Sequence, residues 1–538
     1  MKKSKRSFSK SITRMMVPIV LMIFVGCASG PSDNATTTVQ IHIPNKPVLV
    51  DPMIYGQMLE YCNDRIIYDG IVNKDGSERP HVDSLLKPLQ IPVVRWPAGT
   101  YIFEYNWKNS IGPLDKRPVT KNKTWGGENN NRFGTDEFME WCKKIGTAPY
   151  INFNMGNRPG TDGTLEEALN WIEYVNGSAE TPFGQKRAIN GHKDPYQVKY
   201  WGIGNENYGG WGESDKQSDT VYAQKLNEWA SAIKNRYPDL SLLGVGHTYN
   251  WNKTVLEKNN KLVDFLTQHY YVTSKYKDNK IENPEYSLFA PSKIEEHLQK
   301  LAALLNDVNQ KSDRTQNPIR LSVDEWNNRH SVFKDGEFKF TRQDSRRQSD
   351  VAIVAQILNI FIRQSPVVGM ANYIFPVNAH GLIRTVDDTD AFEASIYYVF
   401  QQYRKWMTGK KLETKVIGPG IIASDIKYNL DGDASEISLG NKPLSFIDAA
   451  AVMNDDGTLN ISVVNRSPSQ SQKVNLEIPE NFIVKKQWAL TNADVNSANV
   501  SENRKAIVPE IIEVEGKKSR ITITIEGCGL YMIQCVAK

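Results

Sequence analysis

The sequence predicts an α/β protein: a (β/α)8 TIM barrel followed by a C-terminal antiparallel β-sandwich. Eight short apolar runs alternate with helical patterns between about residues 47 and 374. After about residue 408, short alternating stretches separated by turns replace that pattern. Two of the apolar runs end in a glutamate, Glu206 and Glu325. Because the working residues of such barrels lie at the carboxyl ends of the strands, these two positions are the first candidates for a site.

The barrel strands are expected at the apolar runs, and Glu206 and Glu325 follow the fourth and the seventh of them. The runs are 47–55, 91–96, 149–154, 198–204, 240–246, 263–269, 319–323 and 369–374. Residues 164–167 (TLEE) and 292–295 (SKIE) are capping boxes that indicate helix starts between the runs. A further helix begins near Thr135 and ends at Gly146.

The C-terminal domain is expected to consist of short strands with tight turns. The strands are predicted at 445–453, 458–465, 473–478, 520–525 and 530–536, and residues 455–457 (DDG) are a hairpin signal. Residues 39–47 are expected to add a strand to this domain. The predicted organisation is therefore a signal peptide (1–26), a tether (27–38), this strand (39–47), the barrel (48–407) and the β-sandwich (408–538).

The N-terminus has the pattern of a bacterial lipoprotein signal. Six basic residues precede the apolar run 15–25, and Gly26 precedes Cys27. We therefore expect cleavage before Cys27, lipidation of its thiol and a lipid-anchored protein in the cell envelope, on the periplasmic or cell-surface face. The alternative is an ordinary signal peptide with an incidental cysteine, which would give a secreted protein.

Charge and cysteine spacing exclude several classes of function. The chain carries 65 Lys and Arg and 61 Asp and Glu, a net charge of +4. Removal of residues 1–26 takes away six basic and no acidic residues, so the net charge becomes −2 and no nucleic-acid surface is expected. The five cysteines form no CxxC pair or Cys/His cluster, and there is no nucleotide-binding motif, so neither a metal nor an organic cofactor is expected.

The residues around the two glutamates favour glycoside hydrolysis. Residues 200–207 (YWGIGNEN) and 321–327 (LSVDEWN) are strand-like runs in which a glutamate stands beside Asn or Trp. Hydrolysis of a glycosidic bond needs two carboxyl groups, one to protonate the leaving oxygen and one to attack or stabilise the anomeric carbon. The competing interpretation of a glutamate after a barrel strand is an ion pair or a solvated side chain.

The chain resembles glycoside hydrolase family 51, best known for α-L-arabinofuranosidases, over nearly its whole mature length. The first-strand motif is similar to residues 54–60 (IYGQMLE), and the second-strand motif and its loop to 94–99 (VRWPAG) and 107–118. Residues 128–139 (ENNNRFGTDEFM), 355–359 (AQILN) and 370–372 (MAN) match later parts of the family. The motifs stand in the family's order, and the resemblance implies the same barrel and sandwich.

The resemblance also implies the site and its chemistry. It makes Glu325 the nucleophile and Glu206 the general acid/base of a retaining reaction, with the two carboxyls about 5–5.5 Å apart, and it makes Glu60 a sugar ligand. A neighbouring carboxylate is expected to raise the pKa of the acid. The candidate substrate-binding residues are Glu60, Arg95, Thr100, Trp125, Asn205, His269, Tyr271, Trp326 and Phe375.

The chemistry of these side chains suggests their tasks. Arg95 can supply positive charge to the nucleophile, and His269 and Tyr271 can hydrogen-bond either carboxylate. Asn205 can bind the sugar 2-hydroxyl, a contact that strengthens in the transition state. Tryptophans 125 and 326 can stack on a sugar face, although a tryptophan at such a position is as often packing.

Two departures from the family pattern leave open which sugar the pocket selects. Thr100 stands where the family has an Asn that binds the furanose, and Phe375 stands where it has a Gln that contacts the sugar. A lost hydrogen bond to a substrate hydroxyl changes selectivity strongly. His380 and Tyr101 are nearby residues that can compensate.

The expected activity is therefore exo-acting, retaining release of α-L-arabinofuranosyl residues from plant cell-wall polysaccharides. The alternatives are another glycoside on the same scaffold (a galactofuranoside, a xyloside or an internal glucan linkage) and a non-catalytic carbohydrate-binding lipoprotein. Besides the carbohydrate, the resemblance suggests a homo-oligomer.

Overall fold

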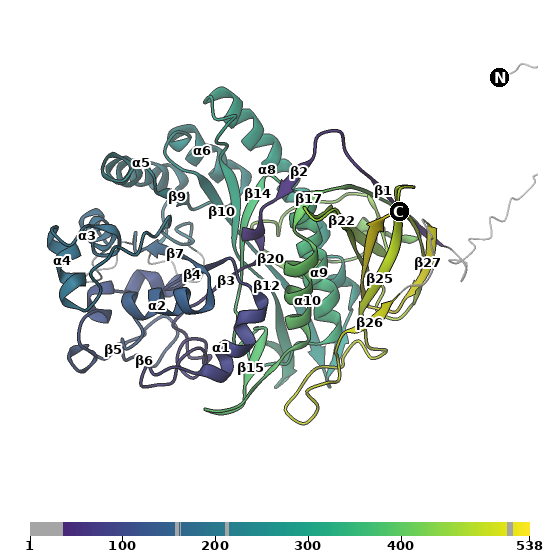
Figure 1. Ribbon diagram of the computed structural model, residues 1–538, viewed down its shortest axis with the longest axis horizontal. Helices are drawn as coiled ribbons and strands as arrows, with labels where there is room; N and C mark the ends of the chain where they lie inside the picture. The colour runs from purple at the N-terminus through teal and green to yellow at the C-terminus, as the bar shows by residue number, and fades with distance from the viewer. Residues whose placement is uncertain (1–35, 157–160, 162, 210–214, 514–519) are drawn as a thin grey trace, which may run out of the picture. The chain divides into compact units, whose positions relative to one another are not determined.

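A closed barrel of eight parallel strands forms the first part of the chain (Figure 1). The computed structural model describes residues 36–156, 161, 163–209, 215–513 and 520–538. The barrel strands are β3 (Gly56–Met58), β4 (Val93–Trp96), β7 (Ala148–Phe153), β8 (Tyr200–Ile203), β9 (Ser241–Gly244), β10 (Phe265–Lys277), β12 (Arg320–Lys334) and β14 (Val368–Tyr373). Each pairs in parallel with its neighbour, and the β10–β12 pairing closes the ring. The predicted fold class is thus confirmed.

Helices follow the barrel strands on the outside. They are α1 (Pro80–Leu86), α2 (Thr135–Ile145), α3 (Leu165–Asn176), α4 (Pro182–Ile189), α5 (Asp219–Arg236), α6 (Tyr249–Asn259), α7 (Glu285–Leu288), α8 (Pro291–Lys311), α9 (Gln348–Arg363) and α10 (Ser395–Trp406). The Thr164 side chain accepts a hydrogen bond from the Glu167 amide at the start of α3, and Gly146 ends α2 at a φ of 76°. At α8 the sequence pattern placed the start too late, because the helix already begins at Pro291.

The first predicted strand is wrong in its position. Val48–Val50 (β2) pairs with β17 in a C-terminal sheet, and Pro52–Tyr55 is a 3-10 turn whose N-cap, Asp51, accepts from the Met53 amide. The barrel strand β3 begins only at Gly56. An added Cβ at Gly56 would lie 2.6 Å from the Ala371 carbonyl oxygen, so the close strand contact requires a glycine here.

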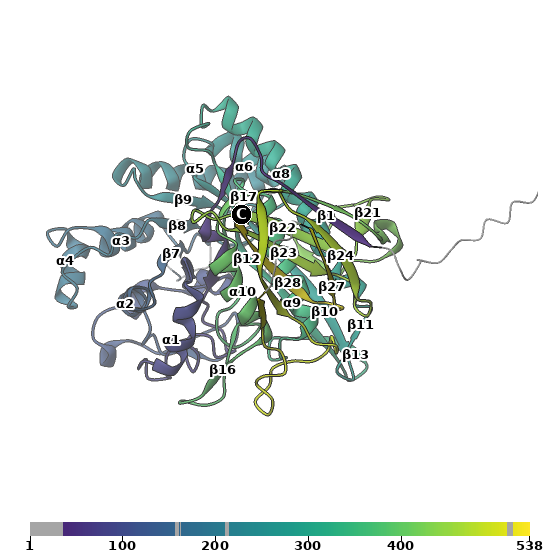
Figure 2. The same ribbon diagram turned by 45° about the vertical axis from the view of Figure 1, so that its right-hand side comes forward.

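Two facing sheets form the C-terminal part (Figure 2). The seven-stranded sheet has the order β2, β17 (Gly409–Lys411), β22 (Ile447–Met453), β23 (Leu459–Asn465), β28 (Leu530–Ala537), β25 (Phe482–Leu490) and β26 (Glu510–Glu513). The four-stranded sheet has the order β18 (Glu413–Ile417), β1 (Thr37–His42), β24 (Gln472–Glu477) and β27 (Arg520–Ile525). All pairings are antiparallel except β1 with β24. Val39, Ile461, Leu476 and Ile533 belong to the core that the two sheets enclose.

Helix α9 joins the barrel to the seven-stranded sheet. It packs against β12 on one side and against β22, β23 and β28 on the other. A helix covered on both sides is apolar around its whole circumference, and residues 348–362 of α9 are all buried.

Short strands complete the described part of the chain. They are β5 (Thr120–Lys121), β6 (Glu128–Asn129), β11 (Lys280–Glu282), β13 (Glu337–Thr341), β15 (Ile383–Thr385), β16 (Ala391–Glu393), β19 (Gly420–Ile422), β20 (Leu430–Gly432) and β21 (Pro443–Ser445). Strand β20 pairs with β10, so a segment that follows the barrel returns to its rim.

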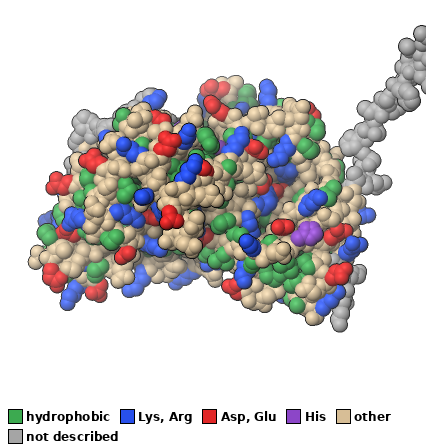
Figure 3. Space-filling model, turned by 90° about the horizontal axis from the view of Figure 1, so that it is seen from above, with side chains coloured by type: hydrophobic (Ala, Val, Ile, Leu, Met, Phe, Trp, Pro, Cys, Tyr) green, Lys and Arg blue, Asp and Glu red, His purple; other side chains and the backbone are tan. Residues whose placement is uncertain are grey.

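The surface carries charged side chains of both signs. On the face drawn in Figure 3, basic and acidic side chains are interspersed. Among the described residues, no helix is both long and apolar enough to cross a membrane.

Candidate active site

Irregularities in β10 and β12 shape the carboxyl end of the barrel. The pairing register of β12 with β14 shifts between Val323 and Trp326, and that of β10 with β12 shifts between Thr267 and His269. A bulge of this kind lets consecutive residues point to one side of a strand. Asp324 and Glu325 accordingly both face the barrel interior, where they are 2% and 5% exposed.

Glu206 and Glu325 lie together. Glu206 follows β8 at a φ of 43° and is 9% exposed. One carboxylate oxygen of Glu206, one of Glu325 and a ring nitrogen of His269 all lie within 4.8 Å of one another. Strands β8 and β12 therefore bring two residues far apart in the sequence to one place, at the short separation that a retaining glycosidase requires.

Arg95, from β4, binds Glu325 and two neighbouring polar side chains. Its Nη1 lies 2.8 Å from Oε1 of Glu325, and its Nε lies 3.4 Å from Oδ2 of Asp324. Its Nη2 donates to Oδ1 of Asn205 over 2.5 Å. A guanidinium that donates in several directions fixes the position of the nucleophile candidate.

His269 connects the carboxylates. Its Nδ1 lies 2.8 Å from Oε1 of Glu206 and 3.6 Å from Oε2 of Glu325, and its Nε2 lies 3.2 Å from Oδ1 of Asp324. The hydroxyl of Tyr271 donates to Oε2 of Glu325, and that of Tyr208 donates to Oε1 of Glu206 over 3.3 Å. All the charged groups are thus held by partners within the site.

The electrostatics differ from the expectation for Glu206. Burial alone would raise the pKa of Glu206, but the hydrogen bond and the charge of His269 outweigh it and hold that pKa below its ordinary value. Burial lowers the pKa of His269, yet Glu325, Asp324 and Glu206 together raise it well above 6.5. The pair of Glu206 and His269 therefore shares one proton, which rests on the imidazole.

Glu60 organises the neighbouring loop. Its Oε1 accepts hydrogen bonds from the amides of Gly99 (3.0 Å) and Tyr101 (3.3 Å) and from Nε1 of Trp125 (3.0 Å). Burial, and then the charge of Glu325, raise the pKa of Glu60 to about 6. An added Cβ at Gly99 would lie 2.9 Å from Oε1 of Glu325, so the loop touches the carboxylate itself.

A pocket opens above these groups. Its lining residues are Glu60, Gly99, Thr100, Trp125, Glu206, Tyr271, Glu325, Asn327, Arg329, Phe340, Arg342, Ile374, Phe375 and His380. Most of the predicted site residues are in this set, including Thr100 and Phe375. Arg95, Asn205 and His269 are not in it, but each is hydrogen-bonded to a group at or near its floor.

The structure contradicts the predicted role of Trp326 as a sugar-stacking residue. It is completely buried and packs against Phe361 of α9 and Phe400 of α10, on the outside of the barrel. The residue after the bulge points away from Glu325, so Trp326 cannot stack on a sugar in the pocket.

Several residues in or beside the pocket were not predicted as site residues. Asp324 adjoins a predicted residue, but strict alternation along a strand would point it outward, and only the bulge turns it in. Arg329, Phe340 and Arg342 come from the β12–β13 hairpin, which extends past the predicted strand end at residue 323. The Asp335-Gly336 turn, with φ values of 55° and 86°, is the sequence signal that could have located that hairpin.

Glu206, His269 and Glu325 also have the spacing of metal ligands. A metal-bound imidazole must be neutral, whereas the surrounding carboxylates raise the pKa of His269 and both ring nitrogens face carboxylate oxygens. These three side chains are therefore better suited to hold a shared proton than a metal ion.

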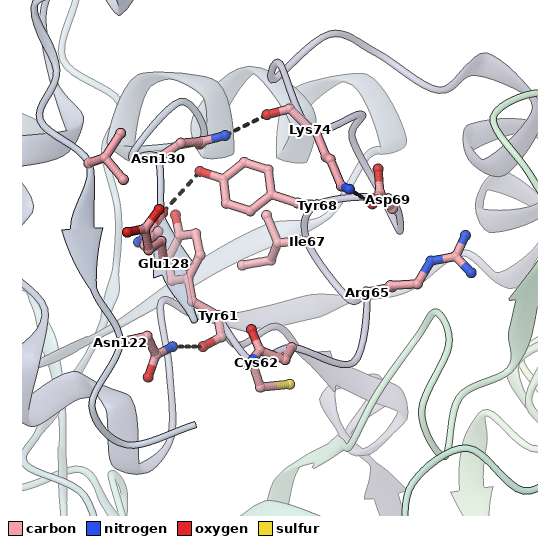
Figure 4. Close-up of a pocket in the computed structure, with 13 residues that line it drawn as sticks. Tyr61, Cys62, Arg65, Ile67, Tyr68, Asp69, Lys74, Asn122, Glu128 and Asn130 are labelled. Carbon is pink, nitrogen blue, oxygen red and sulfur yellow. Dashed lines mark hydrogen bonds and ion pairs between the residues drawn. The ribbon is translucent and has the colours of Figure 1, made fainter. Parts of the chain in front are cut away.

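A second, larger cavity is lined in part by the residues that directly follow Glu60 in the chain (Figure 4). Its volume is about 520 Å³, and Tyr61, Cys62, Tyr68 and Lys74 are among its lining residues. Asn122 connects the linings of the two cavities. Its side chain donates to the carbonyl of Tyr61, which lines the larger cavity, and accepts from the amide of Trp125, which lines the pocket. Glu206 and Glu325 do not line this cavity, so its size does not make it the reaction site.

Comparisons with known proteins agree with this geometry. The "Alpha-L-arabinofuranosidase 1 domain" family matches residues 85–287, and the "Alpha-L-arabinofuranosidase C-terminal domain" family matches residues 324–528. The chain is similar to a probable α-L-arabinofuranosidase C of Aspergillus niger, with 30% identity over 89% of this chain and 94% of the relative. It is also similar to an intracellular exo-α-(1→5)-L-arabinofuranosidase of Bacillus subtilis, with 28% identity over 86% and 91%.

Solved structures give the same result. The chain is similar to the thermostable family 51 α-L-arabinofuranosidase of Thermotoga petrophila, with a TM-score of 0.77 and 29% identity over 93% of this chain and 99% of that one. Similarity over nearly the whole length of both chains covers the barrel and the C-terminal sheets together. The chain therefore belongs to the α-L-arabinofuranosidase family, and it is a glycoside hydrolase.

Proposed function

We propose that this protein is a retaining exo-α-L-arabinofuranosidase in which Glu325 is the nucleophile and Glu206 the general acid/base. The observation that carries the proposal is the position of their carboxylate oxygens within 4.8 Å of each other. An inverting enzyme needs about 6.5–9.5 Å between the carboxyls, to leave room for a water molecule. The name of the Bacillus relative supports exo action.

In the first step, an oxygen of Glu325 attacks the anomeric carbon and the glycosidic bond breaks. The leaving oxygen takes the proton that Glu206 shares with His269. Glu325 is one of the charges that raise the pKa of His269, and its charge disappears as the covalent bond forms. The imidazolium becomes more acidic at that moment, so the proton moves through Glu206 to the leaving group when it is needed.

In the second step, a water molecule attacks the same carbon and releases Glu325. Glu206 is ionised in its pair with His269 and accepts the water proton, which restores the starting state. Arg95 holds Glu325 in place in both steps, through the 2.8 Å contact to Oε1. Two inversions at one carbon give net retention.

Unpaired polar atoms near the pocket support sugar binding. Within the described part of the chain, Nδ2 of Asn205 has no hydrogen-bond partner, and neither has either ring nitrogen of His380. Both side chains are at most 2% exposed, and a buried polar atom without a partner is costly unless a ligand supplies one. We assign Asn205 to the sugar 2-hydroxyl and His380 to a second hydroxyl, in place of the amide that Phe375 lacks.

One experiment tests the mechanism. Wild type and Glu325→Ala would be assayed on nitrophenyl furanosides and pyranosides, and the anomer of the first product followed by NMR. We expect release from the α-L-arabinofuranoside with retention, and a loss of at least about 10³-fold in the variant. An initially inverted product would contradict double displacement.

A different furanoside or pyranoside is the second candidate. Thr100 and Phe375 both line the pocket, so the two departures from the family pattern lie where the sugar binds. The same panel separates the two: a higher kcat/KM on a galactofuranoside or xyloside than on the arabinofuranoside would favour this candidate. Binding without turnover of any substrate would instead indicate a carbohydrate-binding protein.

We further propose that Cys27 carries lipid and anchors the protein in the cell envelope. The support is the sequence pattern alone, because residues 1–35 lie outside the described part of the chain. Incorporation of labelled palmitate into wild type but not into Cys27→Ala is the expected result. Equal labelling of both proteins would overturn this assignment.

A further inference from the structure

Strands β10 and β12 continue well beyond the carboxyl groups of the site. Strand β12 runs from Arg320 to Lys334 and β10 from Phe265 to Lys277, and each turns back into a short antiparallel strand, β13 and β11. Phe333 stands eight residues after Glu325, which corresponds to about 26 Å along an extended strand. A barrel strand does not need this length to place a carboxylate at its end.

The register places one set of side chains on the same face as Glu325. Residues two apart share a face of a strand, so Glu325, Asn327, Arg329 and Phe333 point to one side of β12. Phe333 pairs with Phe338 of β13, and partners across a ladder point to the same side. The residues that carry the argument are Lys275, Lys277, Arg329, Phe333, Phe338 and Phe340, which we call the hairpin face.

The phenylalanines of the hairpin face are open to solvent. Phe333, Phe338 and Phe340 are 36%, 37% and 39% exposed. Two of them form an edge-to-face pair with ring centroids 5.2 Å apart, and cations lie beside them, Lys277 at 4.9 Å from the ring of Phe333 and Lys275 at 5.7 Å from that of Phe338. The opposite face is different, because His330 is fully buried between Asp344 and Asp350.

The hairpin face is continuous with the pocket. Phe340 and Arg329 line the pocket and belong to the hairpin face. Arg329 stacks at 3.4 Å over the ring of Tyr271, whose hydroxyl binds Glu325. A bound substrate that extends out of the pocket on this side would therefore contact these aromatic rings.

We propose that the hairpin face binds the glycan chain from which the terminal sugar is removed. The inference rests on the proposed function and adds the surface that holds the remainder of the glycan, which a small glycoside does not reach. Exposed rings offer flat apolar surfaces for sugar rings, and the neighbouring ammonium and guanidinium groups donate to hydroxyls.

The charges on the face favour a polyhydroxylated chain over a polyanion. Glu282 pairs with Lys275 across the β10–β11 ladder, and Asp431 accepts a hydrogen bond from Thr273, so acidic groups stand among the cations. Donors and acceptors side by side suit hydroxyl groups, which serve as both.

The test compares two substrates. Nitrophenyl α-L-arabinofuranoside fills only the pocket, whereas arabinoxylan would also cover the hairpin face. In Phe333→Ala/Phe338→Ala we expect KM for arabinoxylan to rise about tenfold, with kcat/KM for the nitrophenyl substrate unchanged. Phe338→Tyr should retain wild-type kinetics. Lys339→Ala is the matched control, because Lys339 pairs with Val332 on the opposite face of the same hairpin.

A binding measurement keeps this test independent of turnover. The affinity of Glu325→Ala for arabinoxylan, measured by calorimetry, should fall about tenfold when the two phenylalanines are also replaced. Unchanged affinity and unchanged KM in the Phe variants would overturn the proposal, as would a change confined to the oligomeric state in sedimentation. Failure of wild type to hydrolyse either substrate would instead refute the proposed function, and the binding result would still decide on the hairpin face.

Discussion

The proton shared by Glu206 and His269 is the residue-scale feature on which the chemistry depends. The two side chains are 2.8 Å apart, both buried, and the shifts of their pKa values have opposite directions. A carboxyl acid usually keeps its proton because burial or a second carboxylate raises its pKa. In the proposed mechanism a histidine stores the proton instead, and the bond that Glu325 forms to the sugar controls its release.

This arrangement predicts a change in pH dependence. In wild type the shared proton is lost only as pH rises through the raised pKa of His269, so the basic limb of kcat/KM should lie well above pH 6.5. In His269→Gln the group that lowers the pKa of Glu206 is gone, and Glu206 must hold the proton alone. We expect a loss of about 10²–10⁴-fold and a basic limb at lower pH.

The measurement is the kcat/KM profile of both proteins on the nitrophenyl arabinofuranoside between about pH 4 and pH 10. A merely structural histidine would lower the rate without moving the limb. An unmoved limb would therefore contradict the proton-sharing mechanism.

His380 gives a second residue-scale prediction. Burial, and then the charges of nearby arginines, keep its pKa well below 6.5, so the ring is neutral and can both donate and accept. His380→Ala should lower kcat/KM on the arabinofuranoside about 10–100-fold, because a buried substrate hydroxyl loses its partner. The loss should be the same across the pH range above 6.5, which a rate series at several pH values would check. A wild-type kcat/KM would remove His380 from the sugar site.

The sequence alone located some residues of the candidate site and not others. Glu206 and Glu325 follow from strand ends and the chemistry of their neighbours. Trp326 was misassigned although alternation from the inward Glu325 already points it to the outside of the barrel, whereas Asp324 was missed because a strand bulge is not encoded in any simple spacing. His380 was named only as a nearby residue, since its unpaired nitrogens become visible only when the packing around it is known.

At the scale of elements, the loop after β4 is tied to the reaction. Glu60 holds this loop through the Gly99 and Tyr101 amides, and an added Cβ at Gly99 would lie so close to Oε1 of Glu325 that the carboxylate would have to shift. Residue 99 must therefore remain small if Glu325 is to keep its position.

Gly99→Ala tests this close approach. The added methyl would have to displace Oε1 of Glu325, 2.9 Å away, from its contact with Arg95. We expect kcat to fall at least about tenfold, because small displacements of reacting groups are costly. The melting temperature should change little, and Gly146→Ala at the end of α2 is a control for the effect of an alanine alone on activity. A wild-type kcat in Gly99→Ala would show that the loop is free to move away.

Element boundaries were predictable where one pattern dominated. Most barrel runs lie within a few residues of the observed strands, whereas 47–55 contains a sheet strand, a turn and no barrel strand. The run is mostly apolar because Val50 in the sheet strand and Ile54 and Tyr55 in the turn are all buried, and apolarity alone cannot distinguish the two locations. The extensions of β10 and β12 were missed because their polar and aromatic residues break the apolar run.

At the scale of the whole molecule, Arg363 links the barrel to the C-terminal sheets. From α9 it binds both carboxylate oxygens of Glu295 on α8 (2.7 and 2.8 Å), Asp448 on β22 (3.0 Å) and the Ala449 carbonyl. Burial would lower the pKa of Arg363, but the two carboxylates raise it, so the charge is fully retained.

Arg363→Met should destabilise the protein by about 3 kcal/mol, because two carboxylates lose their partner at a mostly buried position. Urea-induced unfolding followed by fluorescence would measure the loss. Arg504→Met is the control: its partner Asp390 and Arg504 itself are more than a third exposed, so a clearly smaller loss of stability is expected. Equal effects of the two substitutions would refute a special role for Arg363.

The position of β1 has a consequence for how the molecule is made. Residues 38–42 lie between strands that the ribosome adds some 370–440 positions later, since His42 pairs with Glu413 and Thr38 pairs with Asn475. That layer cannot assemble during early synthesis, so the leading segment must wait, unpaired, until translation is nearly finished. A fragment that starts after residue 408 would lack the middle of its own sheet, so the C-terminal sandwich cannot be completed without a strand from the other end of the chain.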